Sequence, residues 1–302
     1  MFFGKINSMK IEKYIQKHKE FLMGYSFLYG IPYKNEHDYS KDYTKAYDYF
    51  LLSKNNGDCL SYYGMAVLKQ FSEGALGDFS YDIAFKKLNN DDSNDPIIKW
   101  IKALCYQYGD GCEKDINMSL SLYNEAINEG CFYASYELGK EYFIGDTFDK
   151  NTDLANYHLN NAYNKGFKNA AYLLGVLYSN EYGDHKEALK FISKSLLFGR
   201  KQSIEDYARL LLGLNIKLNY GKILEIENKL LNNINDNPTR DSAKLIYAKW
   251  LINMGNNDGE FPNKTIKGVK IIKYLAKKGF AEAVNDYNKN SAEFSALFLC
   301  FI

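Results

Sequence analysis

The chain repeats itself every 36 residues through its central part. Residues of the same type recur at this interval in five pairs: Gly130 and Gly166, Ala134 and Ala170, Tyr136 and Tyr172, Gly139 and Gly175, and Tyr142 and Tyr178. A period of about 20–50 residues is typical of solenoid proteins, in which each repeat buries its apolar face against its neighbours. The period therefore constrains the architecture strongly, and the identity of any partner hardly at all.

Each repeat is expected to form two helices. Ala134 and Leu138 lie on one face of a first helix that Gly145 ends, and a second helix runs from Asn151 to Gly166. The position that opens the second helix carries a side-chain oxygen able to accept from free N–H groups of the first turn: Asp42, Ser80, Asp115, Asn151 and Asp184. The closing position carries the residue that best adopts a left-handed conformation: Gly57, Gly130, Gly166, Gly199 and Gly279.

This pattern predicts an organisation for the whole chain. We expect an N-terminal capping helix within residues 1–18, a solenoid over 19–288, and a C-terminal capping helix with an apolar tail over 280–302. First helices are expected near 19–30, 59–71, 97–108, 132–144, 168–180, 201–213, 240–254 and 280–290. Second helices are expected near 42–56, 80–91, 115–129, 151–165, 184–198, 219–233 and 264–278. The repeat units then span about 19–57, 58–96, 97–130, 131–166, 167–199, 200–239 and 240–279.

The residues of the best repeats resemble a known family. The run Tyr106-Gln-Tyr-Gly-Asp-Gly-Cys-Glu-Lys-Asp115, with Leu138-Gly139, Leu174-Gly175, Lys45-Ala46 and Ala162-x-x-x-Gly166, is similar to the Sel-like repeat (SLR) family, a relative of the tetratricopeptide repeat proteins. The resemblance is weaker in 58–96 and 200–240. It departs from the family's pattern at Lys102, where the family has Leu, at Ala66 and Ala103 in place of Gly, and at Cys112 and Phe148 in place of Val. It implies an all-α fold, an α/α solenoid that winds as a right-handed superhelix of about seven repeats. It also implies an adaptor that assembles protein complexes and has no catalytic residue.

Charge and cysteine content indicate which partners and which cellular compartment to expect. The net charge is +1, from 38 basic and 37 acidic residues, so no global field attracts nucleic acid, and we expect no nucleic-acid partner. The cysteines number five and do not follow the repeat, which favours reduced thiols in a cytoplasmic protein. We expect no signal peptide, because the start, Met1-Phe-Phe-Gly-Lys-Ile, lacks a basic stretch followed by an apolar run. We expect no membrane span, because the longest apolar cluster, Phe294–Ile302, is far shorter than the roughly 20 residues a spanning helix needs. That cluster is expected to pack on the last repeat or to serve as a docking tail.

The sequence offers no enzyme site. The four histidines do not combine with cysteines at zinc-ligand spacing, and no glycine-rich phosphate loop occurs, so we expect no cofactor and no metal. Glu137 and Glu141 share a helix face as a general acid and base would, but we interpret them as solvated carboxylates. The chain is therefore predicted not to be an enzyme.

A surface is the better candidate site. The resemblance implies that first helices line a concave groove, and one position on them is aromatic in five consecutive units: Phe21, Tyr63, Trp100, Tyr136 and Tyr172. Helical phase points Tyr133, Lys140, Phe143 and Asn169 into the same groove, and Tyr25 and Arg209 occupy the Lys140 position in other units. Two interpretations of the aromatic positions stay open: packing between repeats, or binding of a peptide or helix.

Three functions fit these observations. The favoured one is a non-enzymatic scaffold that binds a protein or peptide in the concave groove. The first alternative is an immunity-type inhibitor that neutralises a single toxin. The second is an enzymatic or ligand-binding pocket in the bore of the superhelix, near Tyr133, Glu137 and Lys140.

Overall fold

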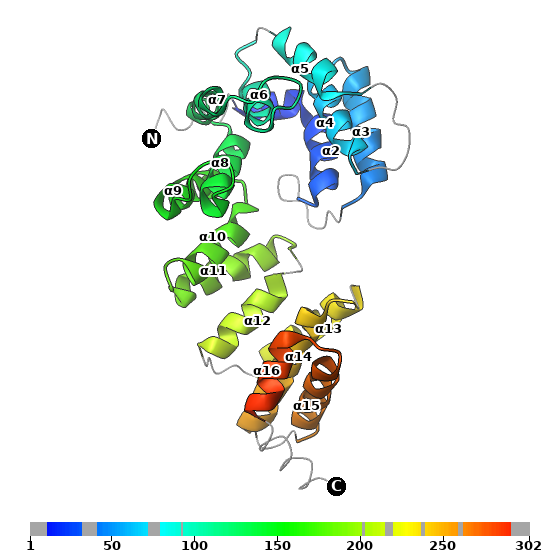
Figure 1. Ribbon diagram of the computed structural model, residues 1–302, viewed down its shortest axis with the longest axis vertical. Coiled ribbons are helices and arrows are strands. Elements are labelled where there is room, and N and C mark those ends of the chain that lie inside the picture. The colour runs from blue at the N-terminus through cyan, green and yellow to red at the C-terminus, as the bar shows by residue number, and fades with distance from the viewer. Residues whose placement is uncertain are drawn as a thin grey trace. The chain divides into compact units, whose positions relative to one another are not determined.

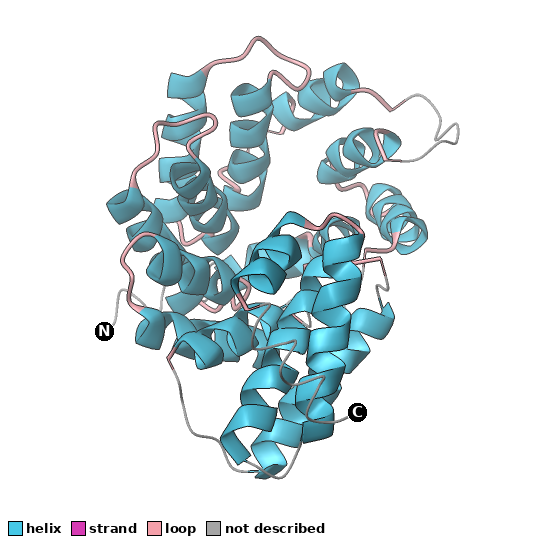
Figure 2. Cartoon of the chain, turned by 60° about the horizontal axis from the view of Figure 1, so that its bottom comes forward, coloured by secondary structure: helices cyan, strands magenta, loops and turns pink. Residues whose placement is uncertain are grey.

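The computed structural model of the protein contains only helices and connecting turns in the residues it describes (Figures 1 and 2). These residues are 11–31, 41–71, 79–91, 93–200, 203–214, 220–236, 239–258 and 262–290. The all-α solenoid fold expected from the sequence is confirmed. The expected apolar tail, Phe294–Ile302, lies outside the described residues, and the number of repeats stays a prediction.

The helices alternate as the repeat predicts. The first helices of the repeats are α2 (Lys19–Tyr29), α4 (Leu60–Lys69), α6 (Pro96–Tyr108), α8 (Phe132–Ile144), α10 (Ala170–Asn180), α12 (Ser203–Gly213), α14 (Asp241–Asp258) and α16 (Ala281–Lys289). The second helices are α3 (Tyr43–Asn55), α5 (Tyr81–Asn89), α7 (Ile116–Asn128), α9 (Thr152–Asn164), α11 (His185–Leu197), α13 (Tyr220–Asp236) and α15 (Pro262–Lys277). Residues 11–17 are also helical. The chain divides into two compact units, an N-terminal unit, Met1–Gly183, and a C-terminal unit, Asp184–Ile302.

The helix ends follow the residues that predicted them. Each expected opening residue accepts a hydrogen bond from the backbone N–H three residues later, as in Asp115 to Met118 at 2.9 Å and Asn151 to Leu154 at 3.0 Å. The same bond occurs at Asp42, Ser80 and Asp184. All five expected closing glycines have positive φ, from 81° at Gly57 to 106° at Gly166. Local side-chain and backbone preferences thus set most helix boundaries.

Close helix approach in the N-terminal unit depends on small residues. Phe50 of α3 is fully buried between Gly24 of α2 and Gly64 of α4. A Cβ at Gly24 would lie 2.6 Å from the Phe50 ring, and one at Gly64 would lie 2.5 Å from it. Neither glycine can therefore be replaced without moving the ring or the helices.

A buried histidine links three elements of the N-terminal unit. His18 follows the helical residues 11–17, and its Nδ1 lies 2.8 Å from Asp58 while its Nε2 lies 2.9 Å from Asp95. Asp95 also accepts from the backbone N–H of Ile97 and thereby caps α6. Burial opposes the charged imidazolium, but the two carboxylates outweigh it and raise the pKa of His18 to about 9. The N-terminal unit is thus joined by a charged, hydrogen-bonded link as well as by apolar packing.

The C-terminal unit is held by apolar side chains. Trp250 of α14 is fully buried among residues of α12 and α13, including Ile204, Leu211 and Leu230. A second cluster joins the other side of α14 to α15 and α16: Leu245, Ala248, Val269, Ile272, Leu275 and Ala283. The helices of this unit therefore pack through aliphatic stripes at helical spacing.

Candidate functional site

The aromatic positions of the N-terminal unit form a stacked interior. Trp100 of α6 stacks on Tyr133 of α8 with ring centroids 5.0 Å apart and an interplanar angle of 15°. Tyr25 of α2 meets Trp100 edge-on, with centroids 5.2 Å apart. Such ring pairs add stability beyond the area they bury. These aromatic residues therefore hold together the first helices of three repeats, α2, α6 and α8.

Burial divides the predicted site residues into two groups. Trp100 is 0% exposed, Tyr63 4%, Tyr133 7% and Tyr25 8%. Side chains this deeply buried have little surface to offer a partner, so the packing interpretation accounts for them. Helical phase alone did not distinguish them from half-exposed neighbours, because it fixes direction along one helix and not what packs against it.

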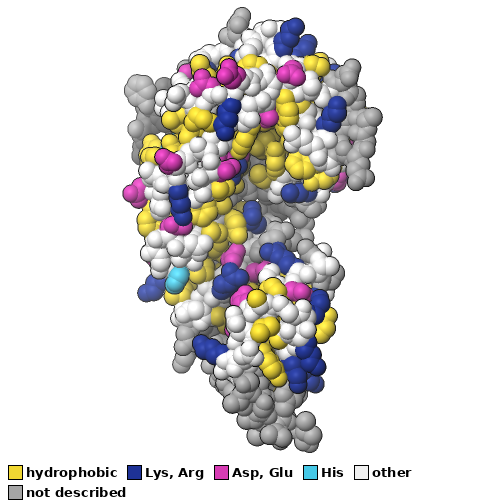
Figure 3. Space-filling view, viewed as in Figure 1, with side chains coloured by type: hydrophobic (Ala, Val, Ile, Leu, Met, Phe, Trp, Pro, Cys, Tyr) yellow, Lys and Arg dark blue, Asp and Glu magenta, His cyan; other side chains and the backbone are white. Residues whose placement is uncertain are grey.

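The second group lies on two neighbouring helices. Tyr136, Lys140 and Phe143 of α8 and Tyr172 of α10 are half-buried, as is Asn169 at the N-terminal end of α10. Figure 3 shows hydrophobic side chains at the surface of this unit, interspersed with charged ones. We call these five residues the α8–α10 face. They are brought together by the packing of α8 against α10.

Arg209 belongs to the other compact unit. It lies on α12 in the C-terminal unit, where its side chain is 57% exposed and pairs with Asp206 at 3.2 Å. Both residues are on the surface of the same helix, so the pair contributes little to stability. The structure therefore assigns Arg209 to a different part of the chain from the other candidates.

The interpretation of Glu137 and Glu141 as solvated carboxylates was wrong. Glu137 is 4% exposed and Glu141 is 3% exposed, beneath the α8–α10 face. Glu137 accepts from the hydroxyl of Tyr25 at 3.3 Å and from the ammonium of Lys140. Glu141 accepts from the hydroxyl of Tyr108 at 3.1 Å. Contacts from two other repeats, on α2 and α6, remove both carboxylates from water, and the sequence of α8 does not show these contacts.

The repeat itself held a signal for these buried carboxylates. The residues 36 positions on either side of Glu137 are Ile101 and Leu173, and those beside Glu141 are Cys105 and Leu177. A carboxylate at a position that neighbouring repeats fill with apolar residues is expected to be buried and to need partners.

The electrostatics of this cluster favour a paired, static arrangement. Burial disfavours the charged Lys140, but the adjacent Glu137 carboxylate outweighs it and holds the pKa of the ammonium above its ordinary value. Burial, reinforced by the charge of Glu137, raises the pKa of Tyr29 to about 12. Both groups therefore keep their ordinary protonation states at neutral pH, with Glu137 and Lys140 as an ion pair.

A nearby histidine lies outside this network. Burial lowers the pKa of His158 to about 4, and its ring stacks on Tyr142 with centroids 5.9 Å apart. The neutral imidazole is packed against the rings of Tyr142 and Tyr157, and its Nδ1 has no hydrogen-bond partner among the described residues. No group of His, Cys, Asp and Glu that could hold a metal ion occurs in the part of the chain that the structure describes.

Comparisons with known proteins agree with this fold. The Sel1 repeat model matches residues 20–58, 103–131, 132–167 and 168–195. The chain is also similar to a solved structure, a protective antigen present in uropathogenic Escherichia coli strains that displays an SLR fold. The identity is 18% and the TM-score 0.55, over 90% of this chain and 57% of the antigen. This chain thus spans little more than half the length of that protein.

A Sel1 repeat protein from Oxalobacter formigenes is similar at 19% identity and a TM-score of 0.42, over 64% of this chain and 78% of the other. No curated protein matches the sequence.

The chain therefore contains Sel1 repeats in these four stretches and has an SLR-type fold, as its sequence pattern predicted. Proteins of this family generally serve as scaffolds for protein–protein interaction, and the fold is typically non-enzymatic. Among the described residues, none of the helices is both long and apolar enough to cross a membrane.

Proposed function

We propose that this protein is a non-enzymatic scaffold that binds a protein or peptide partner through the α8–α10 face. One observation carries the proposal. Tyr136 and Tyr172 occupy the same repeat position on consecutive first helices, and both rings are half-exposed while the equivalent Trp100 is fully buried. Partly buried aromatic side chains are enriched among the residues that dominate protein interfaces.

The surroundings of these rings fit peptide recognition. Tyr136 meets Phe167 edge-on with centroids 4.8 Å apart, so its ring is held in place before a partner arrives. Lys140 and Asn169, the polar residues of the α8–α10 face, are half-buried like the two rings. A rigid aromatic anchor with adjacent polar groups loses little conformational entropy on binding, which favours affinity. The four described cysteines are unpaired, which supports the cytoplasmic location expected from the sequence.

The test compares two tyrosine variants with a matched control. Affinity purification from the source cells with quantitative mass spectrometry identifies the captured protein, and its affinity is then measured with purified components. The double variant Tyr136→Ala, Tyr172→Ala is expected to weaken that affinity by about tenfold or more. Tyr157→Ala is the control, because Tyr157 is 64% exposed on the second helix α9 and lies outside the face.

The outcomes separate the functions. Loss of affinity in the double variant with unchanged helicity supports the proposal, whereas equal affinity of all three proteins contradicts the α8–α10 face as the binding site. Capture of one tight partner, whose toxicity the chain relieves in a co-expression assay, indicates the immunity-type inhibitor instead. Several partners of moderate affinity indicate an adaptor.

A further inference from the structure

The helix α15 and the turn that follows it are strongly basic. They contain no acidic residue and carry six lysines: Lys264, Lys267, Lys270, Lys273, Lys277 and Lys278. Five of the six are exposed, and Lys264, which pairs with Glu227, is the exception. Figure 3 shows Lys and Arg side chains gathered in the region where Figure 1 places α15. The near-neutral charge of the whole chain conceals this local excess.

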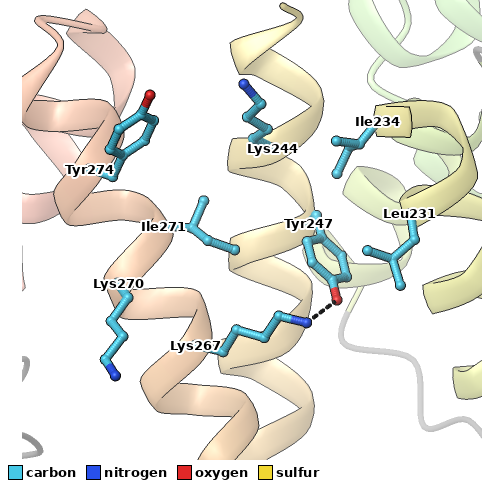
Figure 4. A pocket seen from close by; sticks show the side chains of 8 residues that line it. All are labelled: Leu231, Ile234, Lys244, Tyr247, Lys267, Lys270, Ile271 and Tyr274. Carbon is cyan, nitrogen blue, oxygen red and sulfur yellow. Dashed lines mark hydrogen bonds between the residues drawn. The ribbon is translucent and has the colours of Figure 1, made fainter. Parts of the chain in front are cut away.

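A groove lies beside these lysines, between α13 and α15 and above α14. Its volume is about 370 Å³, which is room for one or two large apolar side chains. Figure 4 shows Ile271 at the centre, Leu231 and Ile234 across from it, and Lys244 and Lys267 toward the two ends. The complete lining is Leu231, Ile234, Lys244, Tyr247, Lys267, Lys270, Ile271 and Tyr274, and none of these residues is acidic.

The rim of the groove keeps its positive charge available. Lys267 donates to the hydroxyl of Tyr247 at 3.1 Å, and its ammonium lies 5.4 Å from the centre of that ring. Neither contact neutralises the ammonium of Lys267, so the two contacts keep its full positive charge at the groove. Lys270 is exposed and has no ion-pair partner among the described residues. Only Lys244 is paired, with Asp241 at 3.2 Å.

We propose that this groove binds a short segment of a protein partner in which one large apolar side chain is flanked by carboxylates. The inference rests on the proposed function as a protein-binding scaffold, and it adds a second surface with its own chemistry. Carboxylates complement the lysines at the rim, and the apolar side chain fills the aliphatic floor between them.

The shape of the groove favours such a segment over other anionic partners. The apolar atoms lie at the bottom of a hollow, where a protruding side chain reaches them and a flat membrane surface does not. A single-stranded nucleic acid binds through a series of aromatic faces, and here only Tyr274, 55% exposed, offers one, because Tyr247 is 3% exposed. The lysines attract an acidic peptide, an anionic membrane and a nucleic acid alike, but only the peptide has a side chain that contacts the apolar bottom of the groove.

The test uses three fluorescein-labelled peptides and the full chain. The first is Asp-Asp-Glu-Phe-Glu-Asp-Asp, the second replaces its Phe by Ser, and the third replaces every acidic residue by Lys. Fluorescence polarisation is expected to show the first peptide binding about tenfold more tightly than either of the others. Vesicles of phosphatidylserine and phosphatidylcholine and a labelled oligo-dT are titrated in parallel.

Protein variants locate the binding. Lys267→Glu and, separately, Lys270→Glu are each expected to weaken the first peptide by about tenfold. Lys186→Glu, an exposed position on α11 outside the groove, makes the same change in net charge and is expected to leave the affinity within about twofold. Circular dichroism checks that the variants fold. Because the lysine variants are separate, failure of one to fold leaves the other as the test.

The proposal is overturned if the three peptides bind alike, or if both groove variants bind the first peptide as the wild type does. Stronger binding of vesicles or oligo-dT than of the peptide, with the same loss in Lys270→Glu, overturns it in favour of a lipid surface or a nucleic acid. The variant Tyr136→Ala, Tyr172→Ala is expected to bind the peptide normally. Failure of the peptide test therefore leaves the α8–α10 face untouched, and failure of that face leaves the groove untouched.

Discussion

The two compact units share one helix-pair design but differ in what their sequences preserve. Residues 1–183 carry 19 Lys and Arg against 24 Asp and Glu, a net charge of −5, whereas residues 184–302 carry 19 against 13, a net charge of +6. The N-terminal unit keeps the period more fully. Both units contain buried polar links, His18 with Asp58 and Asp95 in the first and Asn233 with Glu205 in the second. In the C-terminal unit the repeat over 200–239 lacks the closing glycine of the other repeats, although Gly213 and Gly221 occur within it. The family model matches nothing after residue 195, and in the N-terminal unit it leaves 59–102 unmatched.

The difference shows that the residues that make a repeat recognisable in sequence are not the same as the apolar residues that hold its helices together. Turn residues and caps make the N-terminal repeats recognisable, and each contributes about 1 kcal/mol. Burial of aliphatic stripes on α12–α15 maintains helix pairs even where those turn residues are missing. A repeat can thus lose its sequence pattern and keep its architecture.

The largest expected effect comes from removing the large buried side chain of each unit, which tests whether the two units are destabilised separately. Trp100 and Trp250 are both fully buried, one in each unit. Trp100→Ala and Trp250→Ala are each expected to cost about 3–5 kcal/mol, because each leaves a cavity. Hydrogen exchange with mass spectrometry should show faster exchange in the N-terminal unit for the first variant and in the C-terminal unit for the second.

Each tryptophan variant serves as the control for the other. Equal acceleration of exchange across both units in both variants would show that the chain unfolds as one block. The two units would then not differ in stability.

A pH titration tests how much the charged His18 link contributes to the stability of the N-terminal unit. The pKa of His18 in the folded state is about 9, above its value near 6.5 in the unfolded chain. The stability that the imidazolium contributes is therefore complete below about pH 6.5 and is lost as the pH rises through about 9. The loss is expected to reach about 3 kcal/mol, and it should be confined to the N-terminal unit.

Exchange rates measured from pH 6.5 to 9.5 and corrected for the intrinsic pH dependence check this expectation, with the C-terminal unit as internal reference. His18→Gln removes the titrating group and should flatten the profile. A wild-type N-terminal unit that keeps its protection at pH 9.5 would show that the link to Asp58 and Asp95 does not depend on charge.

The smallest expected effect compares two helical glycines, one in each unit. A Cβ at Gly139 of α8 would lie 3.0 Å from the side chain and backbone of Leu159, so Gly139→Ala is expected to destabilise the N-terminal unit by about 1–3 kcal/mol. A Cβ at Gly213 of α12 would meet nothing within 4 Å. Gly213→Ala is therefore expected to stabilise the C-terminal unit by about 0.5–1 kcal/mol.

Thermal and urea unfolding of the two alanine variants beside the wild type shows whether each substitution lowers or raises the free energy of unfolding. Destabilisation by both substitutions would mean that glycine at position 213 has a packing role that the open space around it does not show.

Much of the fold was predictable because it depends on neighbours in sequence. Helix starts such as Asp115 and Asn151 act on the N–H three residues later, and the closing glycines act through their own φ. The candidate site was predictable only in part. The sequence placed Tyr133 and Tyr136 on one helix, yet one is buried and the other half-exposed, because residues from other helices pack on Tyr133 and not on the whole of Tyr136.

The sequence by itself determined the helix pairs, their caps and their repetition, since hydrogen bonding and backbone conformation act within a few residues. The tertiary structure alone decided that His18 joins Asp58 to Asp95 and that Glu137 and Glu141 are buried. It also decided that three lysines surround an apolar groove on α13–α15. Each of these depends on groups from different helices meeting at a few ångströms, and both burial and charge pairing are properties of that meeting rather than of any one residue.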